Sequence, residues 1–313
     1  MSYDIRFVVV ACAAFAVANL VCCALVPWLW RRRSASSLVR AEELRHLRLL
    51  PAVVSLLFTS LTVVSFSLFE PRGHEPIGTV MIGLASIATA VAGGALVRLF
   101  YLMTSGHRAA HRLLAGAAPI TVEGWPGQAL VIDSAFPIVA IVGIWRPRLL
   151  IARSILTHCT PDELRAILAH EKAHVTRRDN LGRLLLAITP DVISWLPLSE
   201  RIAAAWHDAA EESADESAEQ LGARGRVLLA EALIRVAKLV PPGASPAAVP
   251  MSALYRGENI ERRVRRLLSP IEPVVIRWSR RQRQLGRAMF VLACVLALKG
   301  VYGIVEAAVT FLP

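Results

Sequence analysis

The segment His170-Glu171-Lys172-Ala173-His174 holds two histidines four residues apart, with a glutamate directly after the first. In a helix, residues at this spacing share one face, so both imidazoles can bind a single zinc ion. Zinc lowers the pKa of a bound water to about 7, and a nearby carboxylate can take its proton as the water attacks a peptide carbonyl. The segment therefore predicts one Zn²⁺ ion held by His170 and His174, with Glu171 as the general base.

The residues before this segment form a helix start. Thr160 can cap the helix, Pro161 suits its first turn, and Glu163 completes a capping box. The pattern predicts that both histidines lie on one helix that begins near residue 160.

A catalytic zinc ion takes three protein ligands and keeps one position open, so a third ligand is needed. The segment "WHDAAEESADESAEQ" offers Glu211 and Asp215, four residues apart. We expect Glu211 to bind the metal and Asp215 to orient a ligand imidazole through a hydrogen bond. Spacing alone leaves Glu212 open as the competing ligand. The alternative for the whole segment is a solvated acidic face.

Three further features are candidates for the same site. Asp179 in "RRDN" either hydrogen-bonds back to the histidine helix or serves in the turn that ends it. His207, one turn before Glu211, is a candidate donor to the transition state, with simple exposure as the commoner role of such a histidine. The segment "IVAIVG" at 138–143 is either an edge strand that pairs with extended substrate or an internal strand of the sheet.

The rest of the chain is strongly apolar. Hydrophobic residues make up 55% and charged residues 19%, and the mean hydropathy is +0.51, which is typical of a membrane protein. Four stretches are long enough to cross a bilayer as helices: residues 7–30, 49–69, 77–103 and 288–312. The net charge of +11 comes largely from arginines beside these stretches, so we expect a lipid bilayer and no direct nucleic-acid partner.

The arginines also predict the orientation. Clusters at 31–48 and 277–287 flank the apolar stretches, whereas the connector at 70–76 holds only Arg72. By the positive-inside rule, both termini face outward and the connector at 104–287 faces the cytoplasm. Lys299 lies within the fourth stretch, where a charge is a functional candidate by default.

The connector at 104–287 reads as a folded α+β domain. Its first third predicts short strands and its middle predicts helices. The strands are expected at 120–123, 129–134, 138–143 and 148–153. A Pro/Ala/Gly-rich segment at 241–250 predicts a flexible loop, and "ENIERRVRRLLSP" predicts an amphipathic helix that docks on the domain or lies on anionic lipid.

Together these features predict an α-helical membrane protein with four transmembrane helices. A cytoplasmic α+β zincin-like metallopeptidase domain would be inserted between helices 3 and 4. The expected divisions are residues 1–103 for the first three helices, 104–287 for the peptidase domain and 288–313 for the last helix.

Several quoted motifs resemble those of the BlaR/MecR family of membrane-embedded zinc metallopeptidases. They are "GIWRPRLLIARSIL", "ELRAILAHEKAHVTRRDN", "ISWLPLS" and "EESAD". The E-x-x-A-D pattern, seen also in the related HtpX and CAAX prenyl protease families, falls on Glu211 to Asp215. The resemblance therefore favours Glu211 over Glu212 as the third ligand.

The resemblance implies a multi-pass cell-membrane receptor whose cytoplasmic domain is activated by a signal, cleaves itself and triggers loss of a transcriptional repressor. We therefore expect a cytoplasmic protein substrate, with a repressor first and the loop at 241–250 second. Some relatives carry a penicillin-binding sensor after the last helix. Here the fourth apolar stretch ends next to Pro313, so we expect no such sensor and no β-lactam sensing.

Two other functions stay open. One is a housekeeping protease that resembles HtpX and acts on membrane proteins. The other is a receptor that signals by conformation alone, although such a receptor has little need of Glu171. The inducing signal, the scissile bond and the oligomeric state do not follow from the sequence.

Overall fold

The computed structural model describes residues 2–30, 37–70, 76–222, 224–241 and 260–269. The predicted fourth membrane helix with Lys299, and the predicted loop at 241–250 beyond Pro241, lie outside the described residues.

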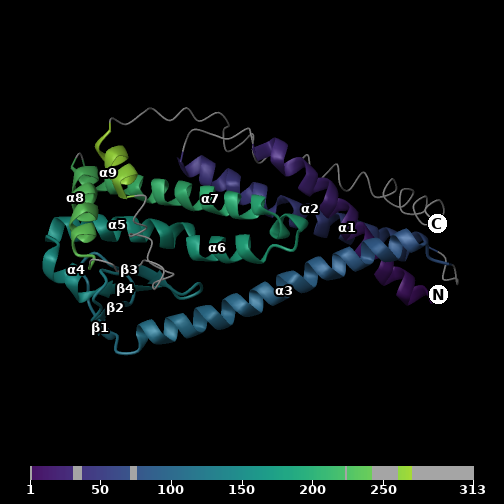
Figure 1. The fold of residues 1–313 in the computed structure, drawn as a ribbon, viewed down its shortest axis with the longest axis horizontal. Coiled ribbons are helices and arrows are strands. Elements are labelled where there is room, and N and C mark those ends of the chain that lie inside the picture. The colour runs from purple at the N-terminus through teal and green to yellow at the C-terminus, as the bar shows by residue number, and fades with distance from the viewer. Residues whose placement is uncertain (1, 31–36, 71–75, 223, 242–259, 270–313) are drawn as a thin grey trace.

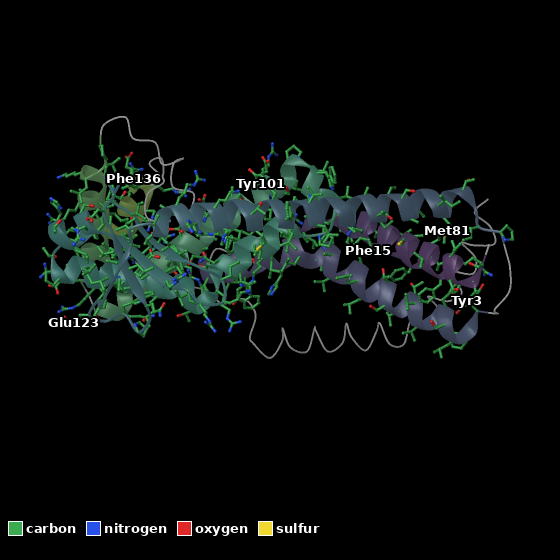
Figure 2. All side chains as sticks on the ribbon, turned by 90° about the horizontal axis from the view of Figure 1, so that it is seen from below. Tyr3, Phe15, Met81, Tyr101, Glu123 and Phe136 are labelled. Atoms are coloured by element: carbon green, nitrogen blue, oxygen red, sulfur yellow. The ribbon has the colours of Figure 1, made fainter. Side chains whose placement is uncertain are left out.

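Three long helices are apolar enough to cross a membrane by length and composition. They are α1 (Tyr3–Trp30), α2 (Ser37–Phe69) and α3 (Thr79–Leu114). They extend together from one end of the molecule (Figure 1). Apolar side chains cover the end marked by Tyr3 and Met81, and nitrogen and oxygen atoms concentrate at the opposite end near Glu123 (Figure 2). The first three predicted apolar stretches are thus helical.

Two of these helices are longer than the apolar stretches within them. Helix α2 begins at Ser37 rather than at residue 49, and α3 continues past residue 103 to Leu114. The added turns are rich in arginine, which keeps good helix propensity while its charge needs water. Hydrophobicity locates the part suited to lipid but does not locate the helix ends.

A four-stranded mixed sheet follows α3. It comprises β1 (Ala118–Ile120), β2 (Ala129–Ile132), β3 (Val139–Val142) and β4 (Arg148–Ala152), in the order β1-β2-β4-β3. Strand β4 pairs in parallel with β2 and antiparallel with β3. All four predicted strands are present, although the first lies at 118–120 rather than 120–123. Strand β3 is an edge strand of this sheet.

Helices follow the sheet, and the first two of them contact its strands (Figure 1). They are α4 (Arg153–His158), α5 (Pro161–Arg177), α6 (Asp179–Ile188), the short 3₁₀ helix η1 (Val192–Trp195), α7 (Pro197–Glu216), η2 (Ser217–Leu221), α8 (Gly225–Lys238) and α9 (Ile260–Leu268). The central strand β4 and helices α5 and α8 form the main apolar core. Leu267 of α9 is buried in this core, so the predicted amphipathic helix docks on the domain.

The segment between α6 and α7, residues 189–196, lies among the membrane-type helices; we call it the α6–α7 connection. Asn19 of α1 makes two side-chain hydrogen bonds of 3.1 Å to its backbone. Arg48 of α2 forms a buried ion pair with Asp191, and Arg98 of α3 donates to the carbonyl of Thr189 at 3.1 Å. All three long helices therefore contact this connection, which the sequence did not predict.

Helix α2 also contacts the far end of α7. Ser37 Oγ donates to Glu216 Oε2 at 2.6 Å, and Arg40 forms an ion pair with Glu212. The N-terminal turns of α2 thus lie beside α7, the helix that also carries Glu211.

Candidate metal centre

Helix α5 begins with the expected capping box. The amide of Glu163 donates to Thr160 Oγ1 at 3.2 Å, and the amide of Thr160 donates to Glu163 Oε2 at 2.7 Å. Pro161 occupies the first turn. The helix ends at Arg177, and Arg178 has a left-handed backbone (φ 55°) that turns the chain into α6. These local features hold both histidines on one continuous helix.

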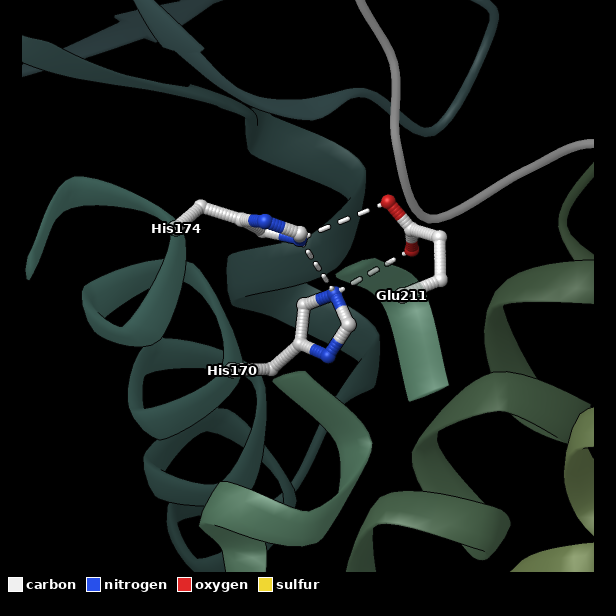
Figure 3. Close-up of side chains that lie close together, drawn as sticks. All are labelled: His170, His174 and Glu211. Atoms are coloured by element: carbon white, nitrogen blue, oxygen red, sulfur yellow. Dashed lines mark hydrogen bonds and ion pairs between the residues drawn. The ribbon is translucent and has the colours of Figure 1, made fainter. Parts of the chain in front are cut away.

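His170 and His174 of α5 meet Glu211 of α7 in a buried cluster (Figure 3). The two Nε2 atoms are 3.2 Å apart. Glu211 Oε2 lies 3.5 Å from His170 Nε2, and Glu211 Oε1 lies 3.4 Å from His174 Nε2. Donor atoms about 2.0–2.1 Å from a tetrahedral zinc ion lie about 3.3 Å from one another. The cluster therefore has the donor types and the spacing that zinc requires.

The hydrogen bonding of Glu211 also fits a cation. Both of its carboxylate oxygens are buried, and neither receives a hydrogen bond from the described residues. Burial raises the pKa of Glu211, but His174, His170 and Arg263 outweigh it and hold the pKa well below its usual value. A buried, ionised carboxylate that accepts no hydrogen bond is costly, and the ion pair with Arg263 at 3.4 Å offsets that cost only in part. A divalent metal between these side chains would remove that cost.

Each histidine turns its other nitrogen toward a carboxylate. His174 Nδ1 lies 2.6 Å from Asp179 Oδ2, and His170 Nδ1 lies 3.1 Å from Asp215 Oδ1, although the second contact is not aligned as a hydrogen bond. Carboxylates in this position fix the ring orientation and raise the basicity of a metal-binding imidazole. Asp179 is also the first residue of α6, so it lies in the turn and contacts the histidine helix.

The charges of these groups follow from their surroundings. Burial lowers the pKa of His170, but Asp215 and Glu211 outweigh it and raise the pKa to about 9. In the metal-free state this imidazole is therefore protonated at neutral pH, and a metal ion must displace that proton. Burial raises the pKa of Asp179, but His174 and Arg177 outweigh it and lower the pKa.

Glu171 is almost fully buried beside the cluster. Burial raises its pKa and the negative charge of Glu211 acts in the same direction, against the lowering effect of the two histidines. A carboxyl group with a raised pKa is suited to take and return a proton near neutral pH. The raised pKa of Glu171 thus fits its predicted role as a general base.

The two remaining sequence candidates lie apart from the cluster. Glu212 faces away from the histidines and pairs with Arg40 and with Arg266, whose Nη1 lies 2.9 Å away. The structure thus brings Glu211, and not Glu212, to the histidines. His207 is half-buried one turn before Glu211 and does not belong to the three-residue cluster.

A cavity of about 320 Å³ opens beside His174. It is lined by Ile141, Gly143, Ile144, Trp145, Pro147, His174, Val175, Arg178, Asn180 and Leu181. Most of these side chains are apolar, and five of the residues lie in β3 or in the turn that follows it. Asn180 donates to the carbonyl oxygens of Ile141 (2.9 Å) and Gly143 (3.0 Å). The cavity therefore joins the edge of the sheet to one side of the histidine cluster.

Sequence reasoning missed Arg263, which reaches the cluster from α9. Its guanidinium is buried and pairs with both Asp215 and Glu211. A signal for it exists in the sequence, because Arg263 shares a helical face with Ile260, Val264 and Leu267. A charged residue inside an apolar face predicts a buried partner.

Comparison with known proteins gives one family match, over part of the chain. Residues 127–267, which hold the whole cluster, match the family model described as BlaR1 peptidase M56. The match supports a metallopeptidase of that family, and the three membrane-type helices suggest a membrane protein.

The crystal structure of S. mikatae Ste24p is similar at 16% identity, with 72% of this chain and 75% of that chain covered and a TM-score of 0.32. No curated protein matched the chain.

Proposed function

We propose that the protein is a membrane zinc endopeptidase that cleaves a cytoplasmic regulatory protein. The observation that carries this proposal is the His170–His174–Glu211 cluster, whose spacing suits tetrahedral zinc and which lies within the residues that match the BlaR1 peptidase family model. When bound, the zinc ion would supply a water of lowered pKa and polarise the peptide carbonyl. Glu171 would be the general base that takes a proton during the attack on the carbonyl and returns it to the leaving amine.

Asp215 and Asp179 hold the two imidazoles so that both Nε2 atoms face the same point. This arrangement reduces the reorganisation that metal binding requires. Both acids are buried, so water competes little for their contacts with the histidines.

Substrate would bind along the outer edge of β3 by replacing the hydrogen bonds that Asn180 makes there. Ala152 donates to the carbonyl of Ile138 at 2.7 Å, so in this antiparallel pair Ile138, Ala140 and Val142 face β4. The backbone groups of Val139, Ile141 and Gly143 then point outward, where Asn180 contacts two of them. An extended peptide that adds to this edge would pass beside His174.

The family resemblance supports a transcriptional repressor as substrate, with self-cleavage in the segment 241–250 as a second event. The arginine distribution supports an arrangement with both termini outside and the peptidase domain in the cytoplasm. A quality-control protease and a non-catalytic receptor remain the competing functions. An intact Glu171 beside an intact ligand set favours catalysis over the second of these.

The test is Glu171→Gln in the full-length protein, reconstituted in vesicles with candidate repressors. The variant should keep one zinc ion per chain while the cleavage rate falls on the order of 10²–10⁴-fold. Cleavage by the variant at the wild-type rate would refute the mechanism. To separate a regulator from quality control, proteins that accumulate in cells carrying the variant should be compared with wild type. One or a few soluble regulators support the proposal, and a broad set of membrane proteins contradicts it.

A further inference from the structure

Arg263 of α9 forms a two-pronged contact with a carboxylate of the cluster. Its Nε donates to Asp215 Oδ2 at 3.0 Å, and its Nη2 donates to Asp215 Oδ1 at 2.6 Å. Both side chains are buried. A bidentate pair of this kind fixes the carboxylate in orientation as well as in charge, which a lysine at the same position cannot do.

The same guanidinium reaches the third candidate ligand. Arg263 Nη1 lies 3.4 Å from Glu211 Oε2, the oxygen that is 3.5 Å from His170 Nε2. On the other side, Asp215 Oδ1 lies 3.1 Å from His170 Nδ1. One planar group therefore contacts two carboxylates of α7, and each of these carboxylates faces a different nitrogen of His170.

The charge of Arg263 also matters to the cluster. Glu171, Glu211 and Asp215 are all buried within it, and carboxylates in such a site repel one another. Arg183 offers a second cation to Glu211, but at 3.7 Å and with a third of its side chain exposed. Arg177 instead donates a hydrogen bond from Nη2 to Asp179 Oδ2 at 2.9 Å. Arg263 is the best-buried of these three cations and contacts the two acids of α7 together.

We propose that Arg263 is a positioning residue of the metal centre, which fixes Asp215 and Glu211 so that the metal-binding geometry exists only while α9 is docked. This inference rests on the proposed zinc site. It makes α9 part of the metal centre, although no residue of α9 belongs to the ligand set.

The experiment measures metal binding in the purified full-length protein without reference to cleavage. Zinc affinity is determined by competition with a chelating dye, and the site is then loaded with Co²⁺ to record its visible absorption. Arg263→Met should lower zinc affinity about 10–100-fold, as expected when a partner of a ligand is removed, and should shift the cobalt bands. Wild-type affinity with an unchanged cobalt spectrum would overturn the proposal.

Two further variants separate positioning from folding. Arg263→Lys keeps a buried cation but loses the bidentate contact with Asp215. This variant should fold as wild type, bind zinc several-fold more weakly and show altered cobalt bands. A cobalt spectrum like that of wild type in this variant contradicts the proposal. The matched control is Arg265→Met, since Arg265 lies on the same helix but is exposed and pairs with Glu261. It should match wild type in both measurements.

Failure of this inference can be told from failure of the proposed function. If the wild-type chain itself binds no zinc, the metallopeptidase proposal fails. If wild type binds zinc and cleaves, and both Arg263 variants bind metal as wild type does, only the role of Arg263 is wrong.

Discussion

Arg48 of α2 and Asp191 of the α6–α7 connection form an ion pair in which both side chains are almost completely buried. Asp191 also accepts a hydrogen bond of 2.8 Å from the amide of Ser194, and Arg48 donates to Ser194 Oγ at 2.6 Å. A membrane-type helix is thereby joined to the segment that leads into α7, the helix of Glu211.

Breaking this pair from one side should destabilise the protein. Arg48→Met leaves the carboxylate of Asp191 buried without its cation, which typically costs about 3–5 kcal/mol. Thermal unfolding in detergent micelles would show a lower midpoint. The double variant Arg48→Met/Asp191→Asn removes the buried charge as well and should recover most of the loss. A single variant as stable as wild type would show that the pair contributes little.

The adjacent glutamates of α7 provide a matched test of the ligand set. Glu211→Gln removes a ligand charge from the cluster, so zinc content after dialysis should fall to background. Glu212→Gln weakens only the contacts to Arg40 and Arg266, so zinc content should stay at one ion per chain. Zinc retention in the first variant and loss in the second would reverse the assignment. Elemental analysis of both proteins is sufficient.

Asp179 should influence metal affinity without binding metal. Asp179→Asn removes the charge that lies 2.6 Å from His174 Nδ1, so we expect zinc affinity to fall about 10–100-fold. Asp162→Asn is the control, because Asp162 lies on the same helix but is exposed and forms its ion pair with Arg165. Equal affinity in the two variants would exclude this role for Asp179.

The capping box of α5 should make stability depend on pH. Burial raises the pKa of Glu163, but the amide of Thr160 and the side chain of Arg235 outweigh it and lower the pKa. A carboxylate with a lowered folded pKa stabilises the fold above its unfolded pKa of about 4.3, and that contribution is lost as pH falls through the folded value. Glu163→Gln should therefore unfold at a lower temperature than wild type near pH 7, with the gap narrowing below about pH 4. A gap that is constant with pH would contradict this.

Gly143 should tolerate no side chain. Its φ is +101°, and a Cβ there would lie 2.8 Å from the carbonyl oxygen of Arg146 in the turn between β3 and β4. Gly143→Ala should lower the free energy of unfolding by about 1–3 kcal/mol. It should also raise KM for peptide substrates, because the same turn lines the cavity. Gly106→Ala is the control, since a Cβ at that helical position meets no atom within 4 Å. An unchanged unfolding midpoint in Gly143→Ala would be the contrary result.

Much of the site could be predicted because it depends on residues that are close together in the sequence. The capping box, the spacing of His170 and His174, and the four short strands each depend on residues close in sequence, and the structure contains them. The approach of Glu211 to the histidines followed from the pattern of "EESAD" within a family resemblance.

The parts that could not be predicted depend on contacts between distant segments. Glu212 is turned away by Arg40 and Arg266, which lie 172 and 54 residues from it in sequence. The position of Arg263 depends on the docking of α9, and the α6–α7 connection is held by single polar residues on three different long helices. Patterns within a short stretch of sequence do not predict contacts between such distant residues.

Helix α2 contacts the α7 region at both ends, through Arg48 at the connection before it and through Ser37 and Arg40 at its last turns. One residue of helix rise is about 1.5 Å, more than a hydrogen bond can stretch and survive. Sliding α2 along its axis by that amount must therefore either carry α7 with it or break contacts at both ends. We therefore expect α2 and α7 to move together, and Glu211 to move with them.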